Sequence, residues 1–362
     1  LNSNTMQEIT SLSGMSSPNS LAVTADLGKL YVANSGGQSV SVFNVNPRTE
    51  DFLSTIATIW VGSQPKGICC QPENEDVYVC NYGSSTISII NPKTNTVRKT
   101  LSSLLKKPWD MVVGPRQISI GFGTQVYHGY ISNYGGDNVL VYESGPDGYG
   151  GVGYDDILDP IPEKGENGQV FLPLQSPRGI VWDPAAGKQY PLTGGCYVGH
   201  SAGGYGVVSH IEFTSQQGTY GPIFLIPNSG AIGGTPGYGK RIFVITAQWG
   251  GPQNPLSGYA VSDVALLDYN RQSWENETWS GNINNVTNLG DLSGPQTFLQ
   301  VNNKDPVRFL NSYTQTFNPD RLYVSFVTAP VIDVVDPYSS QILKTITGVP
   351  RGIQALKTYF KN

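Results

Sequence analysis

Charged residues are scarce in this chain. Only 14% of its 362 residues are Asp, Glu, Lys or Arg, the net charge is −5, and no run of Lys and Arg stands out. A nucleic-acid partner requires a clustered basic footprint, so we expect none. No apolar run approaches the length of a membrane-spanning helix, so we expect no membrane span.

The chain has few histidines, and it lacks the motifs of the common catalytic centres. The chain has only His128, His200 and His210, without HxxxH or HExxH spacing, so we expect no copper, haem or three-histidine zinc site. No nucleophile elbow, phosphate loop or dinucleotide fingerprint occurs in a strand–turn–helix context. The expected cofactor is therefore none, apart from the calcium alternative described below.

The chain has few cysteines, and their spacing is not that of a zinc site. They are Cys69, Cys70, Cys80 and Cys196. Cys70 and Cys80 fall on neighbouring predicted strands and share a face if the turn between them centres near Asn74, so a disulfide bond is one alternative. The other alternative is that the cysteines are small apolar side chains of the core.

Glycine, proline and tyrosine are plentiful, with 43, 25 and 20 residues. Such a composition suits many short strands joined by tight turns. A pattern of strand, Asn/Gly turn and second alternating strand occurs at residues 30–43, 77–92 and 130–142. Hairpins repeated every 40 to 50 residues or so are typical of propeller blades.

The repeat predicts an all-β chain that forms a β-propeller of four-stranded antiparallel blades. The best copy, residues 65–105, holds four strands, and a late copy occupies 321–347. We expect a single domain over residues 1–362 with seven blades favoured and six as the alternative. Pairing of 350–356 with 7–12 would close the ring, and completion of a blade by a neighbouring subunit is a further alternative.

The repeat resembles the YVTN family of β-propellers. The residues that carry the resemblance are Tyr31-Val32-Ala33-Asn34, Tyr78-Val79-Cys80-Asn81, Tyr130-Ile131-Ser132-Asn133 and the Pro-x-Gly-Ile openings at Pro65, Pro177 and Pro350. The resemblance implies a surface-layer, cell-surface or periplasmic protein. A start without methionine agrees with a processed secreted chain.

Three insertions are predicted, at about 144–169, 248–261 and 274–305. The first contains Gly150-Gly151-Val152-Gly153-Tyr154-Asp155, which matches the start of a calcium-binding nonapeptide. Asp147, Asp155, Asp156 and Asp159 would supply hard oxygen ligands to calcium. The alternative is a glycine-rich surface loop with solvated carboxylates.

A second candidate site lies where the blade openings meet the central channel. Lys66, Arg178 and Arg351 occupy the same position of the repeat, and Trp109 is equivalent in the third copy. By repeat symmetry they should surround one mouth of the channel, where the cations could hold an anionic ligand or a carboxylate of a partner. The alternative is that each cation bonds a carbonyl or acid of the next blade. Asp110 and His200 complete this candidate set.

The function favoured by the sequence is a non-enzymatic interaction or structural module of a surface assembly. Its partners would be other surface or secreted proteins, or copies of itself, and its place the cell surface, the periplasm or the exterior. The alternative is a propeller enzyme of the lactonase or lyase type with its site at the central channel.

Overall fold

The structure is a computed structural model of the whole chain. It describes residues 10–73, 76–114, 117–118, 125–144, 155–161, 174–183, 195–202, 205–214, 217–226, 229–236, 241–249, 260–269, 283–288, 310–316, 321–326, 330–335 and 342–350. These residues form antiparallel strands and one short 3-10 helix, η1 (Tyr134–Gly136). No helix in this part of the chain has the length and hydrophobicity needed to cross a bilayer.

The strands form six sheets within the described residues, which we call blades 1 to 6. Blade 1 contains β1 (Pro18–Val23), β2 (Lys29–Asn34), β3 (Ser39–Asn44) and β4 (Thr55–Trp60). Blade 2 contains β5 (Pro65–Cys70), β6 (Val77–Asn81), β7 (Thr86–Asn91) and β8 (Thr96–Leu101). Blade 3 contains β9 (Pro108–Val113), β10 (Gln117–Ile118), β11 (Gln125–Asn133), β12 (Asn138–Ser144) and β13 (Asp156–Ile161).

The other three blades follow the same order. Blade 4 contains β14 (Ile180–Asp183), β15 (Gly195–Ala202), β16 (Tyr205–Thr214) and β17 (Gln217–Ile226). Blade 5 contains β18 (Ser229–Pro236), β19 (Arg241–Trp249), β20 (Ala260–Tyr269) and β21 (Ile283–Asn288). Blade 6 contains β22 (Leu310–Thr316), β23 (Arg321–Phe326), β24 (Val331–Val335) and β25 (Ile342–Thr347).

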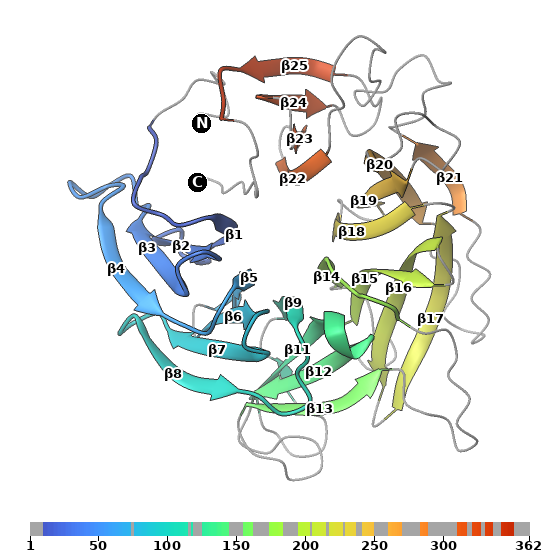
Figure 1. Ribbon diagram of the computed structural model, residues 1–362, viewed down its shortest axis with the longest axis horizontal. Helices are drawn as coiled ribbons and strands as arrows, with labels where there is room; N and C mark the ends of the chain where they lie inside the picture. The colour runs from blue at the N-terminus through green and yellow to red at the C-terminus, as the bar shows by residue number, and fades with distance from the viewer. Residues whose placement is uncertain are drawn as a thin grey trace.

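The blades follow one another around a common axis (Figure 1), and each blade's first strand lies nearest to the centre. Strands run outward in sequence order, so β4, β8, β13, β17, β21 and β25 lie at the rim. This arrangement confirms the predicted all-β propeller of four-stranded antiparallel blades. In blade 3, β10 adds a short fifth strand that pairs with β11.

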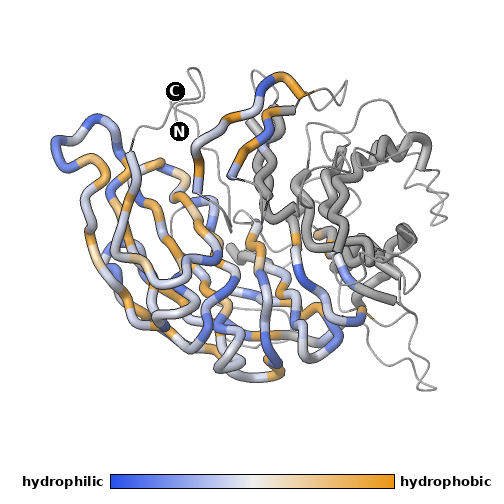
Figure 2. Tube along the Cα trace, turned by 45° about the horizontal axis from the view of Figure 1, so that its top comes forward, coloured by the Kyte–Doolittle hydropathy of each residue, from blue (hydrophilic) through white to orange (hydrophobic). Residues whose placement is uncertain are grey.

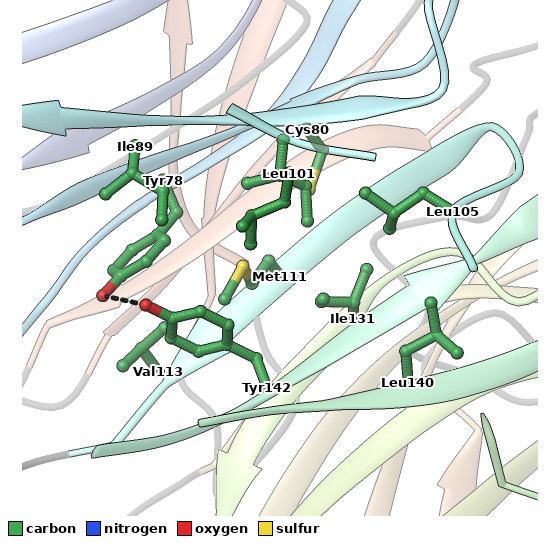
Figure 3. Close-up of a cluster of buried hydrophobic side chains, with 11 residues drawn as sticks. Tyr78, Cys80, Ile89, Leu101, Leu105, Met111, Val113, Ile131, Leu140 and Tyr142 are labelled. Atoms are coloured by element: carbon green, nitrogen blue, oxygen red, sulfur yellow. Dashed lines mark hydrogen bonds between the residues drawn. The ribbon is translucent and has the colours of Figure 1, made fainter. Parts of the chain in front are cut away.

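The second and third strands of blades 2 and 3 are buried on both faces, because each of these two blades packs between two others. Along β6, Val77 and Val79 face the core shared with blade 1, whereas Tyr78 and Cys80 face the core shared with blade 3. Figure 3 shows this second core, where Met111 and Tyr142 of blade 3 meet Tyr78 of blade 2. Such strands need apolar residues at nearly every position. Figure 2 shows hydrophobic residues distributed along the strands of each of these blades.

Hydrogen bonds link neighbouring blades through tyrosines at one position of the repeat. The hydroxyl of Tyr31 donates to Oδ1 of Asn95 in blade 2 at 3.1 Å, and the hydroxyls of Tyr78 and Tyr142 lie 3.2 Å apart. Burial is the main cause that raises the pKa of both Tyr78 and Tyr142. These phenols therefore remain neutral hydrogen-bonding groups inside the core.

The glycine of the Pro-x-Gly opening permits a close approach of two inner strands. A Cβ atom at Gly67 would lie 2.6 Å from Cα of Asp110 and 2.7 Å from the carbonyl oxygen of Trp109. Any larger residue would force β5 away from β9. The motif thus brings the residue before the glycine, Lys66, close to the start of the next inner strand.

Two of the predicted insertions are shorter than expected, because each contains the outer strand of its blade. Strand β13 lies within 144–169 and pairs with β12, and β21 lies within 274–305 and pairs with β20. The prediction missed them because residues that pair at a blade's rim need little hydrophobicity, and Asp and Asn are frequent in both strands. The predicted insertion at 248–261 begins within β19 and ends within β20, where Gln248 pairs with Val261.

Closure of the ring was expected from strands at both ends of the chain. Residues 1–9 and 351–362, which include most of these strands, lie outside the described residues. Residues 10–17 precede β1 and form no strand.

Candidate functional site

Basic and aromatic side chains of blades 2, 3 and 4 meet where their inner strands begin. Lys66 is the second residue of β5, Trp109 is the second residue of β9, and Arg178 lies two residues before β14. The Nζ atom of Lys66 lies 4.1 Å from the ring centroid of Trp109, and Cζ of Arg178 lies 5.1 Å from the same centroid. Residues far apart in sequence thus form one cation–aromatic group around Trp109.

Two tyrosines extend this group. Tyr82 follows β6 and Tyr134 begins η1, and their rings lie 5.6 and 5.4 Å from the Trp109 ring. Lys66 lies 5.2 Å from the Tyr82 ring centroid, and Arg178 lies 5.6 Å from that of Tyr134. The Nζ atom of Lys107 lies 5.8 Å from the ring centroid of Tyr82. We call these residues the channel-mouth cluster: Lys66, Tyr82, Lys107, Trp109, Tyr134 and Arg178.

The cations of the channel-mouth cluster have no acidic partner within the described residues. Arg98 forms ion pairs with Asp76 and Asp155, whereas Lys66, Lys107 and Arg178 form none there. Burial, with a smaller contribution from the nearby Arg178 guanidinium, holds the pKa of Lys66 below its ordinary value. The cluster therefore carries positive charge on aromatic faces, an environment that suits an anion or a developing negative charge.

The sequence predicted part of this group. Repeat symmetry placed Lys66, Trp109 and Arg178 at one mouth, and the structure brings these three together; Arg351 lies outside the described residues. Within the described residues, the side chains of Lys66 and Arg178 contact aromatic rings. The anionic ligand or partner carboxylate, and the alternative of a carbonyl or acid of the next blade, stay predictions. Tyr82 and Tyr134 were not predicted, although both stand in an Asn-Tyr-Gly sequence after the second strand of a blade.

Two further residues of the predicted set lie next to the channel-mouth cluster. Asp110 directly follows Trp109 in the sequence, and His200 directly follows Gly199, which bonds to the backbone of Arg178. Oδ1 of Asp110 accepts a hydrogen bond from its neighbour Met111 at 2.9 Å and would lie 2.5 Å from a Cβ atom on Gly67. The carboxylate thus turns towards the backbone of β5. His200 is buried in β15 and follows Gly199, whose carbonyl accepts from the backbone N–H of Arg178 at 2.9 Å.

Asp155, one of the predicted calcium ligands, lies in a different environment. Both of its carboxylate oxygens accept from Arg98, and Oδ1 also accepts from the Tyr142 hydroxyl at 2.6 Å. Arg98 in turn forms an ion pair with Asp76 at 2.6 Å. This carboxylate therefore joins blade 3 to blade 2 and is not directed at a cation site.

The other predicted calcium ligands are Asp147, Asp156 and Asp159. Asp147 and residues 150–154 lie outside the described residues, and Asp156 and Asp159 belong to β13. Among the described residues, no group of three His, Cys, Asp or Glu side chains is arranged to hold a metal ion. The calcium site stays a prediction without Asp155.

A disulfide bond between Cys70 and Cys80 is not formed. The register pairs Cys70 with Val77, one residue away from the register that a turn centred on Asn74 would give. A shift of one residue moves a side chain to the other face of a strand. Cys70 therefore packs in the core towards blade 1, whereas Cys80 is buried in the core towards blade 3, where burial raises the pKa of its thiol.

Comparison with known proteins gives a partial match to one family. The sequence profile of the family described as lactonase, 7-bladed beta-propeller, matches residues 2–118, which is less than half of the chain. This description favours seven blades over six. No curated protein matches the sequence.

Solved structures with a similar fold include proteins of different chemistry. Hydrazine synthase from Kuenenia stuttgartiensis is similar with a TM-score of 0.63 and 13% identity over 97% of this chain and 92% of that chain. The periplasmic gluconolactonase of Pseudomonas aeruginosa gives a TM-score of 0.57 and 16% identity over 94% and 88%. A candidate 6-phosphogluconolactonase from Bacteroides fragilis gives 0.59 and 14% over 95% and 88%. At these identities the similarity establishes the β-propeller fold.

The matches correct the function expected from the sequence. A non-enzymatic module of a surface assembly was the leading expectation, and the match to the lactonase profile contradicts it. This match favours the alternative, a propeller enzyme of the lactonase type. The expectation was wrong because the YVTN-like residues are blade-packing residues, which propellers of any function share.

Proposed function

We propose that the protein hydrolyses a lactone at the channel-mouth cluster. The observation that carries the proposal is the lactonase match over residues 2–118, a segment that includes Lys66, Tyr82, Lys107 and Trp109 of this cluster. A match to the blades alone would say little of chemistry. Here the matched segment also contains cations that no acid of the described residues neutralises.

The chemistry of lactone hydrolysis suits this arrangement. Water attacks the ring carbonyl carbon, negative charge develops on the carbonyl oxygen, and the ring C–O bond then breaks to give a hydroxy acid. Donors fixed before the reaction stabilise such a developing charge. Lys66 and Arg178, held on the Trp109 ring, would supply these donors, and the same cations would bind the carboxylate of the product.

The aromatic rings and the remaining candidates would have other tasks. Tyr82 and Tyr134 offer apolar surface beside hydroxyl groups, which suits a small hydroxylated ring. Asp110 and His200 are the titratable groups of the candidate set that could take a proton from the attacking water. Replacing each by its uncharged isostere or by alanine would test that task separately.

The proposal is tested by following proton release from a panel of sugar lactones with a pH indicator, after subtraction of spontaneous hydrolysis. We expect a rate above the background for the full chain. In a Lys66→Met, Arg178→Met double variant the rate should fall by roughly 100-fold or more, the usual cost of losing donors to an oxyanion. Lys93→Met, in the exposed turn between β7 and β8, is the matched control. Absence of any rate above the background would refute the proposal.

We also propose that the protein works outside the cytoplasm. The support is the name of one neighbour, a periplasmic gluconolactonase, together with the YVTN-like repeats of the sequence. Fractionation of the native cells, followed by detection with an antibody, tests this location. Recovery with cytoplasmic markers would contradict it.

A further inference from the structure

Asp137 holds the opening of blade 4 from the turn between the second and third strands of blade 3. It is the residue after η1 and adopts a left-handed backbone conformation, with φ 52° and ψ 40°. Its carboxylate oxygen Oδ1 accepts a hydrogen bond from the backbone N–H of Ser176 at 2.7 Å. Ser176 stands two residues before Arg178, a cation of the channel-mouth cluster. The bond therefore joins blade 3 to the segment that carries Arg178.

The segment that carries Arg178 is held at both ends. Asp137 of blade 3 binds the N–H of Ser176, and the carbonyl of Gly199 in blade 4 accepts from the N–H of Arg178 at 2.9 Å. Pro177 lies between these two bonds, buried and with its φ limited by the ring. The chain there has little freedom, so the direction in which the Arg178 side chain leaves it depends on both bonds.

The backbone of this segment needs such support. Ser176 has a φ of 49°, in the left-handed region, whereas the residue before a proline is normally extended. A strained residue of this kind keeps its conformation only where the surrounding contacts determine it. The residues before the prolines that open blades 1 to 3 have the same conformation: Ser17, Gln64 and Lys107. The conformation thus belongs to the repeat, and the bond from Asp137 is one of the contacts that maintain it in blade 4.

The preceding junction contains a bond of the same type. Ser85 directly precedes the third strand of blade 2, as Asp137 does in blade 3, and has a φ of 57°. Its hydroxyl accepts from the backbone N–H of Lys107 at 3.0 Å, and Lys107 directly precedes the proline that opens blade 3. The repeat thus places a side-chain acceptor beside the opening of the next blade. At the junction of blades 3 and 4, this acceptor serves the segment that carries Arg178.

The side chain of Arg178 lies on rings that belong to blade 3. Its Cζ atom lies 5.1 Å from the ring centroid of Trp109 and 5.6 Å from that of Tyr134. Tyr134 begins η1 and Asp137 follows its end, so one short helix carries a ring that Arg178 contacts and is followed by the acceptor that holds its segment. Loss of the Asp137 bond would release the opening of blade 4 from the blade whose rings hold the guanidinium.

We propose that Asp137 is a positioning residue, whose bond to Ser176 holds the Arg178 guanidinium on the rings of the channel-mouth cluster. Its part in lactone hydrolysis rests on the proposed function, in which Arg178 is a donor to the developing negative charge. The positioning of Arg178 does not rest on that function, because it can be measured on the cluster without a substrate.

The titration of Lys66 reports where the Arg178 guanidinium lies. Burial, and after it the nearby guanidinium, hold the pKa of Lys66 below its ordinary value. Competitive labelling of the full chain with an anhydride over a range of pH, followed by mass spectrometry, measures this pKa, with the exposed Lys93 as the reference amine. The Arg178→Met variant defines the rise in the Lys66 pKa that follows loss of the guanidinium.

The Asp137→Gly variant should raise the pKa of Lys66 in the same direction as Arg178→Met, because glycine keeps the left-handed conformation and removes the acceptor. The Asp137→Asn variant keeps an acceptor oxygen and loses a negative charge, so the Lys66 pKa should stay as in the wild type or fall slightly. These opposite directions separate the bond from the charge. Ser85→Gly removes the equivalent bond at the preceding junction and is the matched control, which should leave the Lys66 titration unchanged.

Equal pKa values of Lys66 in the Asp137→Gly and Asp137→Asn variants overturn the proposal, whether or not the chain hydrolyses lactones. Where the wild type hydrolyses a lactone, Asp137→Gly should lower kcat/KM by roughly 10-fold, as expected for a misplaced donor, and Asp137→Asn should retain most of it. A wild type without this activity refutes the proposed function, and the labelling result still decides the positioning. Circular dichroism checks that each variant folds, and Asp137→Ala, which loses the same acceptor, replaces the glycine variant if that one does not.

Discussion

The Nζ atom of Lys66 lies 4.1 Å from the ring centroid of Trp109, although the two residues belong to different blades. The inner strands β5 and β9 approach closely at Gly67, and each presents its second residue at the same end. Arg178, from the opening of blade 4, adds a second cation to the same ring. Packing between three blades thus creates a positively charged aromatic site that no single blade contains.

Replacing Trp109 by leucine should weaken lactone hydrolysis. Without the ring, Lys66 and Arg178 lose the surface that holds them, and the loss of a cation–π contact of about 0.5 to 2 kcal/mol corresponds to about 2- to 30-fold in kcat/KM. Trp109→Phe retains an aromatic face and should retain most of the activity. Steady-state kinetics of the three proteins provide the measurement. Equal losses in the leucine and phenylalanine variants would show that the ring face is not what positions the cations.

Replacing Arg98 by methionine should destabilise the protein. The guanidinium bonds two buried carboxylates, Asp76 and Asp155, which would be left side by side without a counter-ion. Breaking a buried ion pair costs about 3 to 5 kcal/mol, and about 1 to 3 kcal/mol is expected here because 31% of the Arg98 side chain is exposed. Urea unfolding measures the change. Lys93→Met should leave the midpoint unchanged, and a similar stability of both variants would contradict the expectation.

The cost of the Arg98→Met change should depend on pH. Burial tends to raise the pKa of Asp155, but the hydrogen bonds from Arg98 and Tyr142 prevail and hold it below its ordinary value. A carboxyl group with a lowered pKa stabilises the fold above its unfolded pKa of about 3.9, and this contribution is lost as the pH falls through the folded pKa.

In the Arg98→Met variant, Asp155 keeps the hydrogen bond from Tyr142 but loses those from Arg98, so burial has more weight and favours the protonated acid more than in the wild type. The difference in melting temperature between wild type and variant should therefore be large at neutral pH and shrink below about pH 4. Thermal melts from neutral to acidic pH provide the test. A difference that stays constant over this range would mean that Asp155 does not titrate differently in the two proteins.

Asn133→Ala should destabilise the protein more than Asn34→Ala, although both residues end the second strand of a blade. The Asn133 side chain accepts from the backbone N–H of Lys106 at 2.6 Å and donates to the carbonyl of Leu104 at 3.1 Å, so it ties blade 3 to the segment that arrives from blade 2. Asn34 donates only to Ser39 and Ser41 of its own blade.

Each buried hydrogen bond that loses one partner costs about 1 to 3 kcal/mol, so the two variants should differ by roughly 1 to 2 kcal/mol. The free energy of unfolding in urea provides the comparison. A larger loss in Asn34→Ala would show that these inter-blade bonds contribute little.

Some parts of the site could be predicted from the sequence and others could not. Lys66, Trp109 and Arg178 were predicted to meet because they occupy one position of the repeat, and rotation about a common axis brings equivalent positions together. Tyr82 and Tyr134 escaped notice because their Asn-Tyr-Gly sequences serve equally well as turns. The predicted disulfide bond was wrong because the register between β5 and β6 differs by one residue from the expected register. A hydrophobic pattern cannot specify the register of strands that are buried on both faces.

The sequence by itself determined that this chain forms a propeller. The repeated hairpins, their alternating strands and the Pro-x-Gly openings are each set by a few neighbouring residues, so they can be read without the tertiary structure. Only the tertiary structure decided which aromatic rings the cations contact and which carboxylates Arg98 binds. These outcomes depend on side chains from different blades, and their distances are set by how closely the sheets pack around the axis.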